Sequence, residues 1–206
     1  MARQTSTKMK PFAGFRGLKR RVRAALAFAK PWSGFCYRSA SPAYATSGDL
    51  VTGEGSRRNG GRYTTRGRVR SVYGTLRAED ALAEALASFR KRGIADADAL
   101  PRVTAAIAID ARRMLDLRDS ALLAALGLSA NDLVQEWEEE QTAGREALTQ
   151  AIGRACFEAG FDCLLVPSAH LAGQSNLVAF PEALRKSGGE LVARGLEPSR
   201  APAPRG

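Results

Sequence analysis

Cysteine and histidine are scarce in this sequence, and their scarcity excludes a class of sites. The chain has three cysteines, Cys36, Cys156 and Cys163, with no pair at the spacing of metal ligands, and His170 is its only histidine. These residues supply too few soft ligands for a zinc site, so we expect no metal centre. With so few cysteines, a reducing cytoplasm is the simplest compartment.

Long apolar runs are absent as well. The run at residues 24–29 is far too short to span a bilayer or to form the core of a signal peptide, so we expect a soluble protein without a membrane span. No internal repeat is visible, and the spacings of Walker A, Rossmann, zincin and nucleophile-elbow motifs do not occur. Ser168 and His170 do not indicate a serine hydrolase, because residues two apart on a strand are poorly placed for a hydroxyl-to-imidazole hydrogen bond.

Acidic residues are missing from residues 1–30, which carry nine Lys or Arg. The formal net charge of +10 comes almost wholly from this segment, so the remainder of the chain is close to neutral. Charge concentrated on a tail gives little support to a nucleic-acid-binding face on the domain itself. We therefore expect the domain not to bind nucleic acid directly.

The basic segment also has helical spacing in its apolar residues, which are Phe15, Leu18, Val22, Leu26 and Ala29. This pattern is typical of an organelle transit peptide or a membrane-surface anchor, but also of a solvated tail or the upstream extension of a misassigned start. We predict that residues 1–30 form a basic N-terminal extension, either disordered or an amphipathic helix.

The rest of the chain has the composition of one folded domain. At 206 residues the chain can bury about 70% of its unfolded surface, and its 45% hydrophobic and 25% charged residues are ordinary for a globular protein. We assign residues 31–185 to this domain. Residues 186–206 are rich in Pro, Gly and Arg, so we assign them to a disordered C-terminal tail.

Short extended segments alternate irregularly with helices in this domain. Turn signals and alternating or aromatic residues predict strands at residues 34–38, 69–74, 103–109, 163–166 and 177–180. Capping residues and apolar stripes predict helices at residues 78–92 and 142–159, with further helices after Asp119 and from Ser129. Because the order lacks a regular βαβ rhythm, we expect an α+β fold: a single compact domain with small mixed β-sheets flanked by helices.

Residues 53–62 read GEGSRRNGGR, with four glycines and three arginines in ten positions. Glycine makes the backbone permissive, and guanidinium groups resist burial unless they find anionic partners. The segment is therefore not expected to form a packed core element. It is typical of a loop that holds phosphate.

Glu84 lies within an alanine-rich predicted helix. It shares a helix face with Ala81, Ala85 and Ser88, offset from the stripe of Leu82, Leu86 and Phe89. The small side chains would let another element or a ligand come close to a single carboxylate. From its position alone, an ordinary solvated helix glutamate is the competing interpretation.

Several stretches of the chain together resemble the RES domain family, over residues 32–181. They are Tyr37-Arg38, residues 44–50, GEGSRRNGGRY, VYGT, ALAEAL, LPRV, GREALTQAIGRA, FEAGFDCLLVPSA and NLVAFP. The family is named for its Arg, Glu and Ser, and its motif residues fall on Arg38, Arg62, Tyr73, Glu84 and Ser168.

The resemblance implies a function and a partner. It implies the toxin of a bacterial toxin–antitoxin pair, with a fold similar to ADP-ribosyltransferase toxins. Family members degrade NAD by breaking the nicotinamide glycosidic bond, through phosphorolysis or hydrolysis, and some ADP-ribosylate proteins. NAD is then a substrate, inorganic phosphate is the co-substrate of the phosphorolytic reaction, and no cofactor is expected. The implied partner is a helix-turn-helix antitoxin of the Xre class, through which any nucleic-acid binding would occur.

The residue types fit this chemistry. Arg38 and Arg62 can grip a pyrophosphate through planar guanidinium groups, with Arg57 and Arg58 as weaker candidates. Glu84 can stabilise the oxocarbenium-like centre that forms as nicotinamide leaves, or hold a ribose hydroxyl or the nucleophile. We predict catalytic roles for three residues, Glu84, Arg38 and Tyr73. We predict substrate-binding roles for seven, Arg38, Arg62, Arg58, Tyr37, Tyr73, Ser168 and Asn176.

Three of these residues have competing structural interpretations. Tyr73 can stack against nicotinamide or donate a hydrogen bond to it, or it can be a strand aromatic of the core. Ser168 and Asn176 can line the ribose or phosphate pocket, or they can be turn residues that satisfy backbone groups.

The sequence departs from the family pattern at one edge of the expected pocket. Where the family most often has Gly-Gly-Arg-Trp-Asn-Pro-Pro, this chain has Tyr63-Thr64-Thr65-Arg66 after Arg62, so we expect a less rigid edge there. Alternative functions are a protein ADP-ribosyltransferase that uses NAD, and a binding module for nucleic acid or anionic lipid through residues 1–30. An inactive homologue that occupies an antitoxin is a further alternative.

Overall fold

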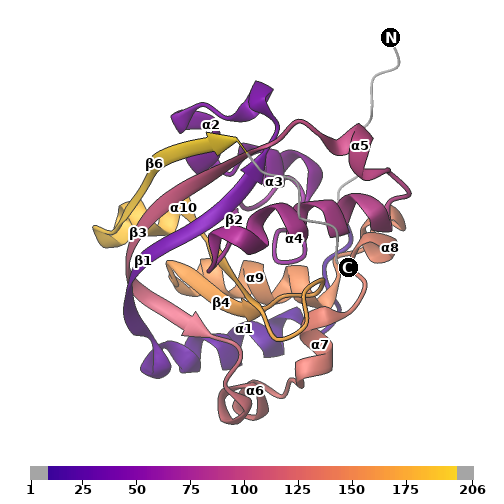
Figure 1. Cartoon of the computed structure of the whole chain (residues 1–206). Helices are drawn as coiled ribbons and strands as arrows, with labels where there is room; N and C mark the ends of the chain where they lie inside the picture. The colour runs from indigo at the N-terminus through magenta and orange to yellow at the C-terminus, as the bar shows by residue number, and fades with distance from the viewer. Residues whose placement is uncertain (1–8, 199–206) are drawn as a thin grey trace.

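The computed structural model describes residues 9–198 (Figure 1). The strands are β1 (Lys30–Ala40), β2 (Val72–Thr75), β3 (Val103–Asp116), β4 (Cys163–Pro167), β5 (Ser175–Ala179) and β6 (Glu190–Pro198). The longer helices are α1 (Phe15–Ala24), α4 (Ala78–Lys91) and α9 (Leu148–Ala159). The shorter ones are α2 (Ser47–Thr52), α3 (Glu54–Asn59), α5 (Asp96–Ala99), α6 (Ser120–Leu126), α7 (Ala130–Val134), α8 (Glu138–Thr142) and α10 (Pro181–Ser187). Two 3₁₀ turns are η1 (Ala25–Phe28) and η2 (Pro42–Tyr44).

The six strands of residues 9–198 join in one sheet with the order β1-β2-β5-β4-β3-β6. The long strand β3 also pairs with β1, so the sheet closes on itself. Neighbouring strands are antiparallel except β3 and β4, which are parallel. The α+β fold and the single compact domain are confirmed, with one closed sheet in place of several small ones.

The strand β3 organises this closure because its two ends have different partners. Its first half lies between β1 and β6, from Val103 to Asp110, while Met114 to Asp116 pair with β4. Ala105, Ile107 and Ile109 are fully buried, as the alternation of the sequence predicted. The observed strand is longer than the predicted one and continues to Asp116.

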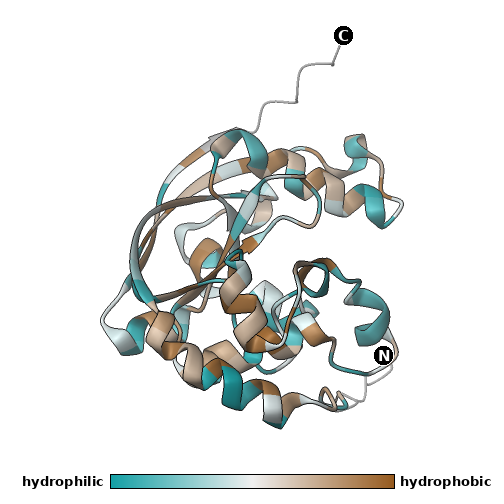
Figure 2. Ribbon diagram, turned by 90° about the horizontal axis from the view of Figure 1, so that it is seen from below, coloured by the Kyte–Doolittle hydropathy of each residue, from teal (hydrophilic) through white to brown (hydrophobic). Residues whose placement is uncertain are grey.

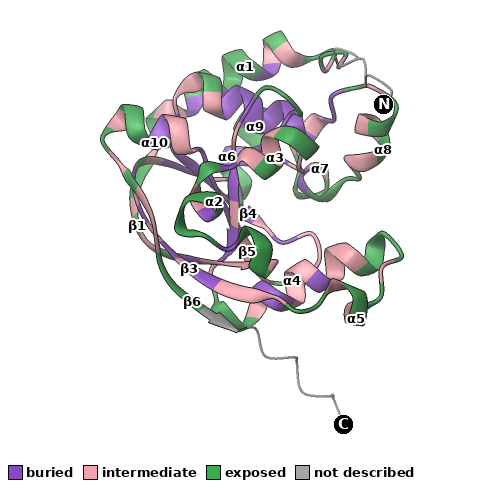
Figure 3. Cartoon of the chain, turned by 90° about the horizontal axis from the view of Figure 1, so that it is seen from above, coloured by how far each residue is buried: buried purple, intermediate pink, exposed green. Residues whose placement is uncertain are grey.

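The N-terminal segment belongs to the core. The predicted amphipathic helix is confirmed as α1, and its apolar face buries Leu18 and Val22 against α9. Figure 3 shows α1 and α9 side by side. Position 31 is therefore not a domain boundary: basic residues occupy the outward face of α1, while its apolar residues complete the domain.

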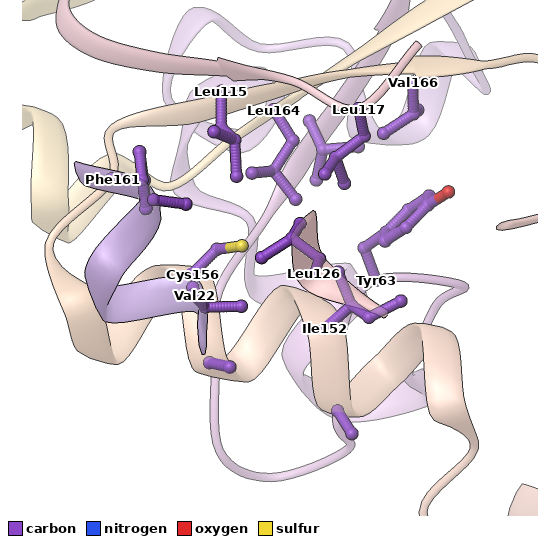
Figure 4. Close-up of a cluster of buried hydrophobic side chains, with 14 of the residues drawn as sticks. Val22, Tyr63, Leu115, Leu117, Leu126, Ile152, Cys156, Phe161, Leu164 and Val166 are labelled. Atoms are coloured by element: carbon purple, nitrogen blue, oxygen red, sulfur yellow. The ribbon is translucent and has the colours of Figure 1, made fainter. Parts of the chain in front are cut away.

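The main core lies between the closed sheet and α9. In Figure 4, Leu115 and Leu164 point from the strands toward Ile152 and Cys156 of the helix, with Val22 nearby. Figure 2 shows that the helices carry both hydrophobic and hydrophilic residues, as expected when only one face of each helix meets the core. Among residues 9–198, no helix combines the length and the apolar composition needed to cross a membrane.

The predicted disorder of residues 186–206 is wrong for residues 190–198. These residues form β6, which pairs with β3 over its whole length, with a bulge at Arg194. The composition suggested disorder, but the free edge of β3 offers backbone hydrogen bonds that a composition argument does not include. Residues 199–206 lie outside the described part of the chain.

Two further expectations are corrected by the backbone. The predicted phosphate loop contains the helix α3, which begins after Gly53 and ends before Gly60; both glycines have a positive φ, of 66° and 81°. The helix predicted at residues 142–159 is divided, because α8 ends at Thr142 and α9 begins at Leu148. Gly144, with a φ of 75°, lies in the break.

Candidate active site

A cleft of about 520 Å³ opens on one side of the sheet. Its walls come from the end of β1, α3 and the turn after it, β2, α4, the segment at Trp137, and the end of β4. In Figure 3, α4 and α5 lie on one side of the molecule and α7 and α8 on the other. The volume is in the range of small-molecule binding sites.

Glu84 projects from α4 into this cleft, and two other elements hold its carboxylate. Ser168 donates a hydrogen bond to Oε2 at 2.6 Å, and the amide of Asn176 donates to Oε1 at 2.8 Å. Ser168 follows β4, and Asn176 lies on β5. Both carboxylate oxygens are thus fixed in position while Glu84 lines the cleft.

The small residues around Glu84 form the adjoining wall, as predicted from the helix face. Ala81, Ala85 and Ser88 all line the cleft with Glu84. Leu82 and Leu86 point the other way and are buried. The face of α4 that carries the carboxylate is therefore open to a ligand, and Glu84 is not a solvated surface glutamate.

The hydroxyl of Ser168 connects this carboxylate to the turn after β4. Its oxygen accepts hydrogen bonds from the backbone amides of His170, at 3.1 Å, and Leu171, at 2.8 Å. With two donors on the oxygen, its single proton is directed at Glu84. Ser168 therefore combines the two alternatives considered for it: it accepts hydrogen bonds from backbone amides of a turn, and it contacts Glu84.

Tyr73 lies on β2 between the cleft and the core. Its hydroxyl oxygen accepts from the Tyr63 amide at 2.9 Å and lies 2.6 Å from the Thr64 hydroxyl. Burial raises the pKa of Tyr73 to about 12, so the hydroxyl stays protonated at neutral pH. Gly61 permits this arrangement, because a Cβ there would lie 2.8 Å from the Tyr73 hydroxyl.

Residues 63–65, at the edge of the cleft after Arg62, are buried and hydrogen-bonded. Tyr63, Thr64 and Thr65 are buried, and the Thr65 hydroxyl donates to Glu146 at 2.6 Å. Gly153 of α9 lets this segment approach, since a Cβ there would lie only 1.9 Å from the Tyr63 carbonyl oxygen. Burial and hydrogen bonds hold residues 63–65 in this position, while the lower rigidity expected at this edge stays a prediction.

Arg38, on β1, places its positively charged guanidinium group in the cleft. Its guanidinium donates to the Leu50 carbonyl at 3.3 Å, and among the described residues no carboxylate pairs with it. Burial lowers the pKa of Arg38. The neighbouring Arg102 also has a lowered pKa, first through burial and then through the charges of Arg38 and Arg92. Positive charge is therefore concentrated at this end, where an anion would relieve the repulsion.

Arg62 and Tyr37 also line the cleft, while two other arginines do not. Arg57 and Arg58 both bind the carboxylate of Glu54, which lies one helical turn earlier on α3. With Arg70 they hold the pKa of Glu54 well below its usual range. Their guanidinium groups pair with an acid of their own helix in the structure, so substrate contact by Arg57 and Arg58 stays a prediction.

Some cleft residues had no role in our sequence predictions. Phe89 was assigned to the buried stripe, yet it lines the cleft, with the guanidinium groups of Arg92 and Arg102 over its ring at 4.9 and 5.1 Å. Phe89 lies four residues after Ala85, and this spacing could have placed it on the helix face that lines the cleft. Trp137 comes from a distant segment and gave no signal. His170 was considered only as a partner for Ser168, but it lines the cleft.

Comparison with known proteins defines the family. A family model described as the RES domain matches residues 35–193, from β1 into β6. The chain belongs to the RES domain family. The matched range covers Arg38, Arg62, Tyr73, Glu84 and Ser168, and it includes the first residues of the C-terminal strand.

A solved structure shares the fold of this RES domain protein. The chain is similar to one from the crystal structure of the M. tuberculosis MbcT–MbcA toxin–antitoxin complex, with a TM-score of 0.70 and 24% sequence identity. The similarity covers 89% of this chain and 92% of the other. No curated protein matches the chain.

Proposed function

We propose that this RES domain protein cleaves the bond between nicotinamide and ribose in NAD. One observation carries the proposal: a doubly hydrogen-bonded carboxylate, Glu84, shares a cleft with the guanidinium group of Arg38, which has no acidic partner among the described residues. An anion-binding end and a carboxylate end suit a substrate that carries a pyrophosphate and a ribose.

The pyrophosphate lies against Arg38 and Arg62. Guanidinium groups bind phosphate oxygens in pairs of parallel hydrogen bonds, which orients the substrate as well as holding it. Burial strengthens this contact at Arg38, because the charge is incompletely solvated. The ribose that bears nicotinamide then faces α4, where the small side chains of Ala81 and Ala85 leave room.

Glu84 acts at the glycosidic bond. As the bond breaks, its electron pair moves to the ring nitrogen of nicotinamide, and positive charge develops on the ribose. The Glu84 carboxylate stabilises that charge, and the hydrogen bonds from Ser168 and Asn176 keep it in place throughout. The ribose carbon is then attacked by inorganic phosphate or by water, which releases a proton in the second case.

The acceptor is determined by product analysis. The purified protein is incubated with NAD, with and without inorganic phosphate, and the products are identified by mass spectrometry. Loss of NAD with release of nicotinamide is expected. A phosphorylated ADP-ribose indicates phosphorolysis, free ADP-ribose indicates hydrolysis, and label on a protein indicates ADP-ribosyl transfer. Intact NAD in both conditions would contradict the proposal.

We further propose that the protein is a toxin neutralised by a partner. The solved complex of similar fold is a toxin–antitoxin pair, and the family resemblance suggests an Xre-type helix-turn-helix antitoxin that covers the cleft. Both proteins would act in the cytoplasm, where NAD is available. Expression of the protein alone should slow growth and lower cellular NAD, and the partner should reverse both. Unchanged NAD in arrested cells would contradict this mechanism.

A further inference from the structure

One wall of the cleft runs along α4 from Glu84 to the end of the helix. Ser88, Lys91 and Arg92 line the cleft after Glu84. Lys91 lies seven positions after Glu84, which is about two helical turns or roughly 10 Å along the axis. The wall thus has a carboxylate near one end and ammonium and guanidinium groups at the other.

The cationic end of this wall is already occupied by acidic side chains of the protein. Lys91 forms ion pairs with Glu136, at short range, and with Glu138, at 3.4 Å. The guanidinium of Arg62 donates a short hydrogen bond to the carbonyl of Gln135. We name residues 135–138, the link between α7 and α8 together with the first residue of α8, the acidic strap. Trp137 and Glu138 of the strap line the cleft.

We propose that Lys91 is a further substrate-binding residue and that the acidic strap competes with the substrate for it. Lys91 joins Arg62 and Arg38 in the subsite for a pyrophosphate or similar phosphate anion. In the free protein, Glu136 and Glu138 neutralise Lys91, and the Gln135 carbonyl holds Arg62. The assignment of this anion to NAD rests on the proposed function, but the subsite itself does not.

The strap contacts have the strength expected of a displaceable competitor. The side chains of Lys91 and Glu136 are 32% and 53% exposed, so water and salt screen the pair. Exposed ion pairs of this kind contribute little to stability. A pyrophosphate carries more charge on adjacent oxygens than either carboxylate does, and it contacts more than one of these cations at once. It can therefore displace the strap from Lys91 without disturbing the fold.

Binding of inorganic pyrophosphate tests the subsite directly, because it needs no turnover. Affinity is measured by calorimetry at moderate salt, without divalent cations. The double substitution Glu136→Gln/Glu138→Gln should tighten binding about two- to tenfold, since it removes the competing charges. The matched control is Glu139→Gln/Glu140→Gln, which removes the same charge from α8. Neither control residue lines the cleft, and Glu140 pairs with Arg145.

A double-mutant cycle with Lys91 separates competition from a general change of charge. Lys91→Gln should weaken pyrophosphate binding about two- to fivefold. In that background the strap substitutions should lose their effect, because the cation for which they compete is gone. These exposed substitutions are expected to change stability little, and urea unfolding checks that each variant is folded.

The outcomes distinguish the strap from the proposed function. Equal affinity of the parent and the strap variant for pyrophosphate would overturn the proposed competition. The same conclusion would follow if the control variant gained as much affinity as the strap variant, or if the strap substitutions still raised the affinity in the Lys91→Gln background. If NAD is not cleaved but the strap variant binds pyrophosphate more tightly, the strap stands and the proposed function fails. If NAD is cleaved and the strap variant gains nothing, only the strap fails.

Discussion

The carboxylate of Glu84 is held by two donors that are 84 and 92 positions away in the chain. One of them, Ser168, accepts two backbone hydrogen bonds and uses its hydroxyl hydrogen to donate a hydrogen bond to Glu84. The orientation of the carboxylate is thus fixed by the backbone of the turn after β4. A residue that could be dismissed as part of a turn is also a positioning residue for the carboxylate.

Substitution of Ser168 by Ala should lower both activity and stability. The carboxylate loses a charge-assisted hydrogen bond, so we expect kcat for NAD cleavage to fall about tenfold or more, with a smaller change in KM. Two amides also lose their acceptor, which should cost about 1–3 kcal/mol in free energy of unfolding. Steady-state kinetics and urea unfolding measure the two effects. Ser168→Thr retains the hydroxyl and should recover part of kcat; kcat at the parent value in Ser168→Ala would contradict the positioning role.

Substitution of Tyr73 by Phe tests the buried hydroxyl at the other wall. The Tyr63 amide donates to this hydroxyl, so its removal leaves a buried donor unsatisfied. We expect a loss of about 1–3 kcal/mol in the free energy of unfolding, measured in urea at pH 7. Phe fills nearly the same volume, so packing is preserved. A change below about 0.5 kcal/mol would show that the hydroxyl does not support this edge of the cleft.

At the scale of elements, local sequence patterns predicted the helices and strands that have one apolar face and one polar face. The predicted helix at residues 78–92 appears as Ala78–Lys91, with its acidic first turn and its apolar stripe. The alternation of Ala105, Ile107 and Ile109 located β3. Both patterns indicate which face of the element is buried, and this information is contained in residues close together in the sequence.

Other elements depended on distant partners that no local pattern contains. The strand β6 forms because β3 offers a free edge, and α1 completes the core because α9 has an apolar face to cover. In α3, Glu54 pairs with two arginines one turn later, which the glycine-rich sequence did not indicate. The position of the acidic strap was also not predictable from local sequence, because Glu136 and Glu138 contact Lys91 on a distant helix.

The helix α1 provides the test at this scale. Leu18 is 1% exposed, so Leu18→Ala should lower the free energy of unfolding by about 2–5 kcal/mol. Arg20→Ala on the exposed face of the same helix should change it by less than about 0.5 kcal/mol. Deletion of residues 1–30 should prevent folding, because it uncovers the face of α9. A folded, active deletion variant would show that α1 is an appendage.

At the scale of the whole molecule, the closed sheet and its covering helices bury all three thiols. Burial raises the pKa of Cys36 from 9.0 to about 12, and it also raises the pKa values of Cys156 and Cys163. Burial likewise raises the pKa of Tyr73 from 10.0 to about 12. In each case the folded protein binds the proton more tightly than the unfolded chain does.

These shifts predict a fall in stability at alkaline pH. Their stabilising contribution is fully present below the unfolded pKa of the thiols, near pH 9, and is lost as the pH rises through the folded values. The free energy of unfolding in urea should therefore decrease steadily from pH 9 to pH 11. Each titrating group contributes at most about 1.4 kcal/mol per pH unit. A constant stability from pH 8 to pH 11 would contradict the burial of these groups.

The central claim is that Glu84 stabilises the charge that develops as nicotinamide leaves NAD. The most direct measurement is the rate of nicotinamide release by the parent protein, by Glu84→Gln and by the control Glu79→Gln. Glu79 lies on the same helix, where it is exposed and pairs with Arg77. We predict a loss of about 100-fold or more for Glu84→Gln and little change for Glu79→Gln. Equal rates for all three proteins would contradict the account.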